Sequence, residues 1–227
     1  MADTIQLLAE RYPLTEVTIA AAGRDWRIVA VTDQDALANR IRTEEDLCNF
    51  PYGLMLWASA IGLAQKLSAE PERIRGRRVL EIGAGIGVAG LAAAHLGGVV
   101  TQTDYLEEAL ILCRHNARVN GIAGTVTRRG DWRAWPSDLP PFPVVIGSDV
   151  LYDREMHPVL RELLPSLVEP GGTVLLSDPI RPQALDFTES LERTGRWSVA
   201  MEGLQVRFES QVKDLALFHL TLETDPS

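Results

Sequence analysis

The sequence predicts an α/β protein built on a doubly wound, mostly parallel β-sheet. From residue 77 onward, short apolar runs alternate with helical patterns. One run, residues 143–148, is apolar along its length, and the first run of the series opens into a glycine-rich loop. Alternating strands and helices are typical of parallel sheets with helices on both faces, and a continuously apolar strand is typical of the centre of the sheet. Ligands of such sheets bind beyond the carboxyl ends of the strands, so we expect the functional residues there.

The region before this sheet is expected to form a small extension. Residues 1–12 have the pattern of a short helix. Two runs of alternating apolar and polar residues, 15–20 and 25–31, are separated by a glycine-containing turn and predict a β-hairpin. Residues 32–52 carry mixed charge, and we expect helix fragments and loop there.

The remaining elements follow from apolar periodicity and from breakers. A helix over residues 54–68 is ended by Glu70-Pro71. Strands are predicted at 78–82, 99–103, 125–128, 143–148 and 173–177. Helices are predicted after the first of these strands as far as residue 96, and at 106–119, 155–167 and 187–194. Two final β runs, 197–201 and 214–222, are expected to pair antiparallel at one edge of the sheet.

Composition narrows the class of protein. The chain has 227 residues and is 46% hydrophobic, which is enough for a substantial core without disulfides. Cys48 and Cys113 are far apart and lie in no metal-ligand spacing, so we expect no metal site and a reducing, cytoplasmic compartment. No signal-like or bilayer-length apolar segment is present, so no membrane partner is expected. The net charge of −9 disfavours nucleic acid and suits a basic protein partner.

The glycine-rich loop is the first candidate site. Gly83, Gly85 and Gly87 follow the strand that contains Glu81, and a helix begins behind them. Glycines allow a ligand to approach the backbone closely, and the helix N-terminus offers free N–H groups. The spacing also fits a dinucleotide fingerprint. We expect Glu81 to favour a ligand with an amino group and a sulfonium, because its carboxylate would repel a pyrophosphate.

The next two strand ends carry further acids. Asp104, followed by Tyr105, is placed to accept hydrogen bonds from both hydroxyls of a ribose, as a nucleoside ligand requires. Asp131 follows the third strand and is expected to accept from an adenine amino group, while Trp132 stacks on the base or shields it. An acid at each of several successive strand ends is a more specific signal than the glycines alone.

The fourth strand ends in Ser148, Asp149 and, three residues later, Tyr152. An acid and a phenol at this spacing, directly after an apolar strand, are expected to face the place where cofactor and substrate meet. Our hypothesis is that Asp149 and Tyr152 bind an amine and aim its lone pair at the reacting carbon.

Several of these segments resemble a known family. Residues 79–87 (VLEIGAGIG) resemble motif I of the class I, seven-stranded methyltransferases. Residues 52–57 (YGLMLW), the pair Asp131-Trp132 and residues 149–152 (DVLY, a D-x-x-Y motif) resemble methyltransferase family 16, the seven-stranded protein lysine methyltransferases. Bacterial relatives labelled nicotinamide N-methyltransferase-like share this resemblance, which covers roughly residues 50–180.

The resemblance implies a seven-stranded, Rossmann-like methyltransferase domain over residues 53–227, with residues 1–52 as an extension packed on it. It implies that S-adenosylmethionine is the cofactor, and that Asp149 and Tyr152 border the substrate channel as the catalytic pair. Together with the reasoning from single residues, it predicts a set of cofactor-binding residues: Trp57, Glu81, Gly83, Ala84, Gly85, Gly87, Asp104, Tyr105, Asp131, Trp132 and Ser148.

The expected function is therefore S-adenosylmethionine-dependent N-methylation of a protein amine, at a lysine side chain or an N-terminus. One alternative is a small-molecule methyltransferase that acts on an amine or a pyridine. Another is an NAD-type oxidoreductase or a non-catalytic nucleotide-binding module. The Asn-Pro-Pro-Tyr motif of many glutamine and DNA-adenine methyltransferases is absent from the sequence. The sequence makes no prediction of the oligomeric state.

Overall fold

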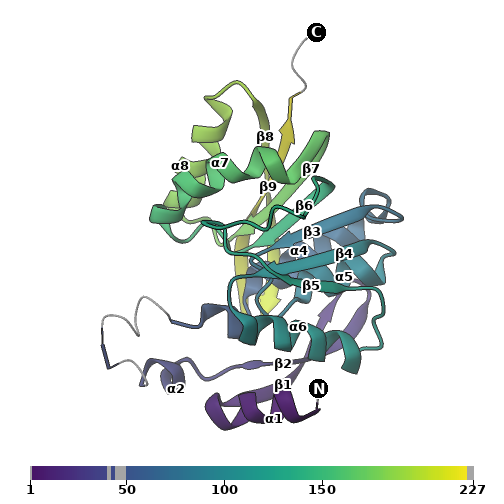
Figure 1. The fold of residues 1–227 in the computed structure, drawn as a ribbon, viewed down its shortest axis with the longest axis vertical. Helices are drawn as coiled ribbons and strands as arrows, with labels where there is room; N and C mark the ends of the chain where they lie inside the picture. The colour runs from purple at the N-terminus through teal and green to yellow at the C-terminus, as the bar shows by residue number, and fades with distance from the viewer. Residues whose placement is uncertain (1, 40–41, 44–49, 224–227) are drawn as a thin grey trace.

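Two β-sheets organise the chain in the computed structural model, which describes residues 2–39, 42–43 and 50–223. The larger sheet has seven strands in the order β5-β4-β3-β6-β7-β9-β8 (Figure 1). Its strands are β3 (Arg78–Ile82), β4 (Val99–Asp104), β5 (Val126–Arg129), β6 (Phe142–Ser148), β7 (Val168–Asp178), β8 (Trp197–Phe208) and β9 (Gln211–Leu222). The first five are parallel to one another, whereas β9 is antiparallel to both β7 and β8. The predicted seven-stranded, mostly parallel sheet is confirmed.

The order of the strands reverses between β3 and β6. The chain runs outward from β3 through β4 to β5, and then returns to place β6 on the other side of β3. The crossovers on the two sides leave opposite faces of the sheet, so a crevice opens between them at the carboxyl ends of the strands. The fold therefore provides a binding position next to the loop that follows β3.

Helices cover both faces of this sheet. They are α4 (Ala58–Ala69), α5 (Val88–His95), α6 (Glu107–Val119), α7 (His157–Leu167) and α8 (Pro182–Glu192). Successive side chains of a strand point to opposite faces. Val79 of β3 accordingly packs in a core cluster with residues of α4 and α5, and Leu80 packs in another with residues of α7 and α8. Burial on both faces explains why the strands are apolar at consecutive positions.

The N-terminal segment packs on the α6 side of the sheet. It consists of α1 (Ala2–Arg11) and a two-stranded hairpin, β1 (Leu14–Ala21) and β2 (Arg24–Val31), which lies beside α6 in Figure 1. Ala22 and Gly23 both have positive φ, as a two-residue hairpin turn requires. The Asn116 side chain of α6 accepts from the Val29 N–H at 2.8 Å and donates to the Ile86 carbonyl at 3.0 Å. One amide thus ties the hairpin to the glycine-rich loop.

Several element boundaries differ from prediction. The helix expected from residue 54 begins at Ala58, because Tyr52–Leu54 form a short 3-10 turn (η1) and Trp57 is extended. The helix expected from residue 187 begins at Pro182, since proline fits the first turn of a helix. The final two strands are confirmed as an antiparallel edge pair but are longer than expected.

Only part of the region expected as helix fragments and loop is described. It contains the short helix α2 (Gln34–Ala38), while residues 40–41 and 44–49, including Cys48, lie outside the described residues. Among the described residues, no helix is both long enough and apolar enough to cross a membrane.

Candidate functional site

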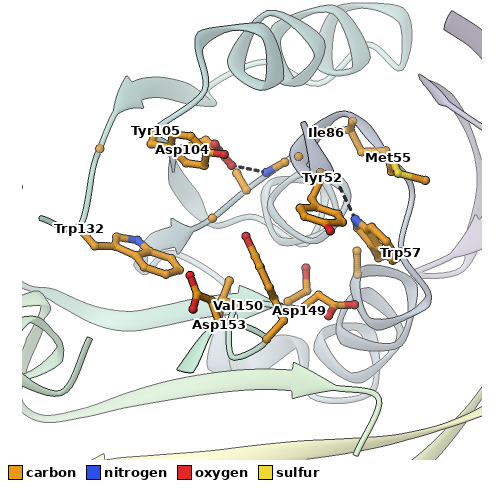
Figure 2. A pocket seen from close by; sticks show the side chains of 18 of the residues that line it. Tyr52, Met55, Trp57, Ile86, Asp104, Tyr105, Trp132, Asp149, Val150 and Asp153 are labelled. Carbon is orange, nitrogen blue, oxygen red and sulfur yellow. Dashed lines mark hydrogen bonds between the residues drawn. The ribbon is translucent and has the colours of Figure 1, made fainter. Parts of the chain in front are cut away.

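A pocket opens at the carboxyl ends of β3, β4 and β6, where the strand order reverses (Figure 2). Its wall comes from the turn before α4, the glycine-rich loop, the end of β4, the segment after β5 and the segment after β6. The predicted site residues on this wall are Trp57, Gly83, Ala84, Gly85, Asp104, Tyr105, Asp131, Trp132, Ser148, Asp149 and Tyr152. The fold thus gathers residues from five separate segments of the chain around one cavity.

The glycine-rich loop exposes its backbone atoms at the bottom of this pocket. Gly83 has φ 58° and Gly85 has φ 55°, a region that favours glycine. A Cβ on Gly83 would lie 2.7 Å from a methyl carbon of Val150, and one on Gly85 would lie 3.1 Å from the Gly53 carbonyl oxygen. Neither position has room for a side chain, so the loop presents main-chain atoms to the cavity.

Asp104 lies on the wall at the end of β4 and is only 4% exposed. Its Oδ2 accepts from the Gly85 N–H at 2.9 Å, and its Oδ1 accepts from the Leu106 N–H at 2.9 Å. Burial raises the pKa of this carboxyl group above its usual value, while the backbone donors oppose that shift. Asp104 therefore connects the glycine-rich loop to the start of α6 and keeps its carboxylate at the cavity.

Two residues predicted to bind the cofactor, Glu81 and Gly87, do not line the pocket. The two-residue period of β3 turns Glu81 beneath the loop, where its Oε2 accepts from Gln102 Nε2 at 2.8 Å. A Cβ on Gly90 of α5 would lie 2.3 Å from this oxygen, so the carboxylate sits against the helix. Gly87 faces the side chains of Gln102 and Cys113 instead of the cavity. Glu81 and Gly87 thus lie behind the pocket lining, and their contact with a cofactor stays a prediction.

The Glu81 side chain is 1% exposed, and burial raises its pKa to about 7. Its Oε1 and the Gln102 Oε1 are buried without a hydrogen-bond partner among the described residues. A proton on Glu81 would remove the buried charge at little cost near neutral pH. Glu81 is thus a titratable core residue that packs behind the glycine-rich loop.

Asp149 is on the pocket wall, but both of its carboxylate oxygens have protein partners. Oδ1 forms an ion pair with Arg181, and Oδ2 accepts from Ser59 Oγ at 3.2 Å. Arg181 also contacts Asp178 Oδ2 at 2.9 Å, and Asp178 is completely buried at the end of β7. Asp149 has φ 59°, and its N–H donates to the Ser177 carbonyl at 2.8 Å. Asp149, which the sequence predicted to bind an amine together with Tyr152, thus shares its charge with Arg181.

Aromatic rings border the outer part of the pocket. The ring centroid of Tyr52 lies 5.6 Å from that of Tyr152 and 6.3 Å from that of Trp57. The Trp57 indole N–H donates to the Tyr52 carbonyl at 3.0 Å, which fixes the short turn before α4 (Figure 2). Burial raises the pKa of Tyr152 to about 12, and nearby negative groups add to this. The Tyr152 phenol is therefore neutral at physiological pH.

The opposite side of the pocket is formed by the segment after β5. Asp131 accepts from the Arg133 N–H at 3.0 Å and pairs with its guanidinium at 2.8 Å, which lowers the Asp131 pKa. Trp132 faces the cavity in Figure 2, and a Cβ on Gly83 would lie 3.4 Å from its ring. The indole thus closes the pocket above the glycine-rich loop.

Sequence reasoning missed several residues of this site. Arg181 lies outside the pocket lining and more than thirty positions after Asp149, so no local pattern connects them. Asp153 also lines the pocket, directly after the predicted D-x-x-Y motif. An acid next to that motif was a signal that could have found Asp153.

Comparison with known proteins identifies relatives. The profile of a family described as lysine methyltransferase (Methyltransf_16) matches residues 35–194. The protein N-lysine methyltransferase METTL21A of Danio rerio is 34% identical over 182 residues, 77% of this chain and 81% of that protein. The histone-arginine methyltransferase METTL23 of Xenopus laevis is 32% identical over 163 residues, 69% of this chain. The match spans 65% of the METTL23 length.

Solved structures agree with the fold. The 16S rRNA N2 G1207 methyltransferase (RsmC) of T. thermophilus, in complex with AdoMet and guanosine, superimposes with a TM-score of 0.64 at 16% identity. That superposition covers 93% of this chain and 51% of RsmC. TrmN from Thermus thermophilus gives 0.56 at 24% identity, over 72% of this chain and 48% of TrmN. At such identities, these likenesses support the fold alone.

Proposed function

This chain belongs to the lysine methyltransferase family, and from that premise we propose that it methylates an amine of a protein with S-adenosylmethionine as the methyl donor. The resemblance to methyltransferase family 16 is confirmed, and with it the class of enzyme, a methyltransferase. The observation that carries the proposal is the pocket at the switch in strand order. The pocket combines Asp104, an acid suited to a ribose, with a glycine-rich loop that has no covering side chains. Aromatic side chains border its outer part.

The residues of this pocket fit S-adenosylmethionine. Asp104 presents a carboxylate to the cavity next to the loop, as the hydroxyl groups of a ribose require. Gly83 and Gly85 leave no room for side chains and so allow the methionine part to approach the backbone. Tyr52 and Trp57 offer ring faces, which attract a sulfonium by about 1 kcal/mol each. Trp132 is positioned to shield the adenine.

When bound, the cofactor supplies an electrophilic methyl group on a positively charged sulfur. The protein's task is to hold the acceptor nitrogen in line with that methyl group, because orientation provides most of the acceleration in such a displacement. A lysine ε-amine has a pKa near ~10.4 in water and must lose a proton before it attacks. Tyr152, whose pKa is about 12, stays protonated and can orient the amine by hydrogen bonding. The proton leaves to water, so no dedicated base is needed.

We propose a protein as the acceptor for two reasons. Relatives named as lysine methyltransferases act, by their names, on protein lysine or on EEF1A. The chain also has a net charge of −9, which favours a basic protein segment. Other relatives are named for histone arginine and for protein histidine, so lysine is the proposed acceptor within a wider group of protein nitrogens. The alternatives of a small-molecule methyltransferase and an oxidoreductase are not favoured. The cytoplasmic location stays a prediction.

Methyl transfer to an array of lysine-centred peptides and to proteins of a cell lysate tests this proposal. The donor carries isotopically labelled methyl groups, and mass spectrometry identifies the modified residue. We expect labelled methyl groups on lysine nitrogens of proteins or peptides, and none with a heat-inactivated enzyme. Label that appears only on small molecules, or on no acceptor, would contradict the proposal.

A further inference from the structure

The described part of the pocket wall carries four aspartates, and three of them have all their oxygens engaged within the protein. These are Asp104, held by two backbone N–H groups, Asp131, paired with Arg133, and Asp149, held by Arg181 and Ser59. The fourth, Asp153, differs in its partners. Its charge is not balanced by a cation among residues 2–39, 42–43 and 50–223.

Asp153 begins the short 3-10 helix η3 (Arg154–Met156), directly after Tyr152. Its Oδ1 accepts from the Glu155 N–H at 2.9 Å, and within the described chain no donor contacts its Oδ2. The neighbouring Arg154 pairs with Asp186 and is not available to Asp153. Figure 2 shows Asp153 beside the cavity, between Trp132 and Asp149. One oxygen of Asp153 thus fixes the local backbone, and the other is left for a ligand.

The surroundings of this oxygen suit a cation. Tyr52 and Tyr152 are 41% and 43% exposed, with ring centroids 5.6 Å apart, and both line the same pocket as Asp153. Ring faces attract ammonium groups, and a carboxylate adds a charge-assisted hydrogen bond. A neutral pyridine could stack on the rings but would not form the charge-assisted hydrogen bond, and a phosphate would be repelled by the carboxylate.

We propose that Asp153 is the counter-charge of an acceptor subsite, where the incoming lysine binds as an ammonium ion against the Tyr52 and Tyr152 rings. This inference rests on the proposed function and deepens it. It assigns recognition of the acceptor charge to Asp153, and it leaves Asp149 as a positioning residue held by Arg181.

The charge of Asp153 favours binding of the acceptor but opposes the chemical step. Asp153 stabilises the ammonium ion and so raises the pKa of the bound amine, whereas reaction requires the neutral amine. The ammonium first loses its proton to water. The nitrogen lone pair then forms the new N–C bond while the S–C bond breaks and its electron pair stays on sulfur. Asp153 therefore favours binding of the acceptor, and the pH dependence of turnover should reflect its charge.

Asp153→Asn tests the proposal with little disturbance of the fold, because asparagine can still accept the Glu155 N–H. The matched control is Asp138→Asn, which removes the same charge from an exposed residue outside the pocket lining. The probe is the lysine-centred array peptide that the wild-type enzyme methylates fastest, together with the same peptide carrying norleucine in place of lysine. Binding of both is measured by fluorescence polarisation with S-adenosylhomocysteine present, and methyl transfer is followed across a range of pH.

We expect the wild-type protein and Asp138→Asn to bind the lysine peptide about tenfold more tightly than the norleucine peptide, a ratio that corresponds to about 1.4 kcal/mol. Asp153→Asn should lose this preference, and its KM should rise about tenfold. The rising limb of kcat should move to lower pH, because the bound amine loses its proton more easily without the carboxylate. The affinity for S-adenosylhomocysteine should stay unchanged.

The outcomes distinguish a failure of the acceptor subsite from a failure of the proposed function. If the wild-type enzyme methylates peptides, but Asp153→Asn still prefers the lysine peptide and the rising limb of its kcat stays at the wild-type pH, the acceptor subsite is wrong. The proposed function then stands. If the wild-type enzyme binds S-adenosylhomocysteine but methylates no peptide or protein, the proposed function fails and the subsite fails with it.

Discussion

The two sides of the pocket hold their acids in different ways. On the glycine-loop side, Glu81 and Asp104 are buried and accept hydrogen bonds from neutral donors, an amide side chain and backbone N–H groups. On the β6–β7 side, Asp149 and Asp178 share the guanidinium of Arg181. Burial raises the pKa of both Glu81 and Asp104, and no lysine or arginine is among the causes of either shift. The first side is built from local backbone geometry, and the second depends on a charge brought from a distant segment.

This difference separates the tasks that we assign to the two sides. We assign the nucleoside of the cofactor to the Asp104 side, where two backbone donors fix the carboxylate. We assign the acceptor to the Asp149 side, where the ion pair with Arg181 holds a backbone with positive φ in place. Variants on one side should therefore change cofactor binding or core stability, and variants on the other should change turnover.

Glu81→Gln tests the neutral-donor side through stability and has the largest expected effect. Because burial raises the folded-state pKa of Glu81 to about 7, above its unfolded value, the stabilisation from its proton is complete below pH ~4.5 and is lost as the pH rises through 7. Relative to the wild type, Glu81→Gln should gain about 3 kcal/mol between pH 4.5 and pH 8. Urea unfolding of both proteins across this range measures the difference. If the free energies of unfolding of the two proteins changed in parallel with pH, Glu81 would not titrate in the core.

Asp104→Asn tests the same side through the ligand. The variant keeps one acceptor oxygen but loses the charge that receives the ribose hydroxyl groups, so the Kd for S-adenosylhomocysteine should rise about 100-fold, or about 2.7 kcal/mol. Calorimetric titration measures this change, and thermal unfolding checks that the variant is folded. A Kd within threefold of the wild-type value would remove Asp104 from the cofactor site.

Arg181→Met tests the ion-paired side. It leaves Asp149 and the fully buried Asp178 without their shared cation, and the free energy of unfolding should fall by about 2 kcal/mol because Arg181 itself is partly exposed. Turnover should fall with it, while affinity for S-adenosylhomocysteine changes less than threefold. Arg181→Lys should recover part of both losses. An equal loss of cofactor affinity would erase the distinction between the two sides.

Tyr152→Phe has the smallest expected effect. It removes only the hydroxyl group that orients the amine and keeps the ring beside Tyr52. We expect kcat to fall about tenfold, or about 1.4 kcal/mol, with unchanged affinity for S-adenosylhomocysteine. Steady-state methyl transfer to the array peptide measures kcat. An unchanged kcat would assign the phenol to the rim of the pocket without a role in the reaction.

The sequence predicted most of the fold because the controlling signals are local. Short apolar runs located β3, β4 and β6 to within one residue, although only β6 is apolar along most of its length and β4 continues into the polar residues TQTD. The start of the helix expected at residue 54 was wrong, because the turn at Tyr52–Leu54 is followed by an extended Trp57. The final hairpin was underestimated although its far half, as far as Phe208, alternates polar and apolar residues, which is the signal that predicted the N-terminal hairpin.

The site was predictable where the chain itself places a residue at a strand end. Asp104 and Asp149 follow this rule. Glu81 differs, because it lies inside the strand and the two-residue period turns its side chain away from the pocket lining. Arg181 was not predictable from a local signal, since its contact with Asp149 requires β6 and β7 to pair with Ser148 opposite Ser177. Local patterns identify the acids of the pocket, and tertiary pairing decides which of them are free.

Calorimetric titration of the wild-type protein with S-adenosylmethionine, S-adenosylhomocysteine and NAD, repeated on Asp104→Asn and Tyr152→Phe, tests the central claim most directly. We predict that both adenosyl ligands bind the wild type and Tyr152→Phe equally, that Asp104→Asn loses this binding, and that NAD does not bind. Binding of NAD alone would contradict the account, and equal loss of adenosyl binding in the two variants would contradict the division of the pocket.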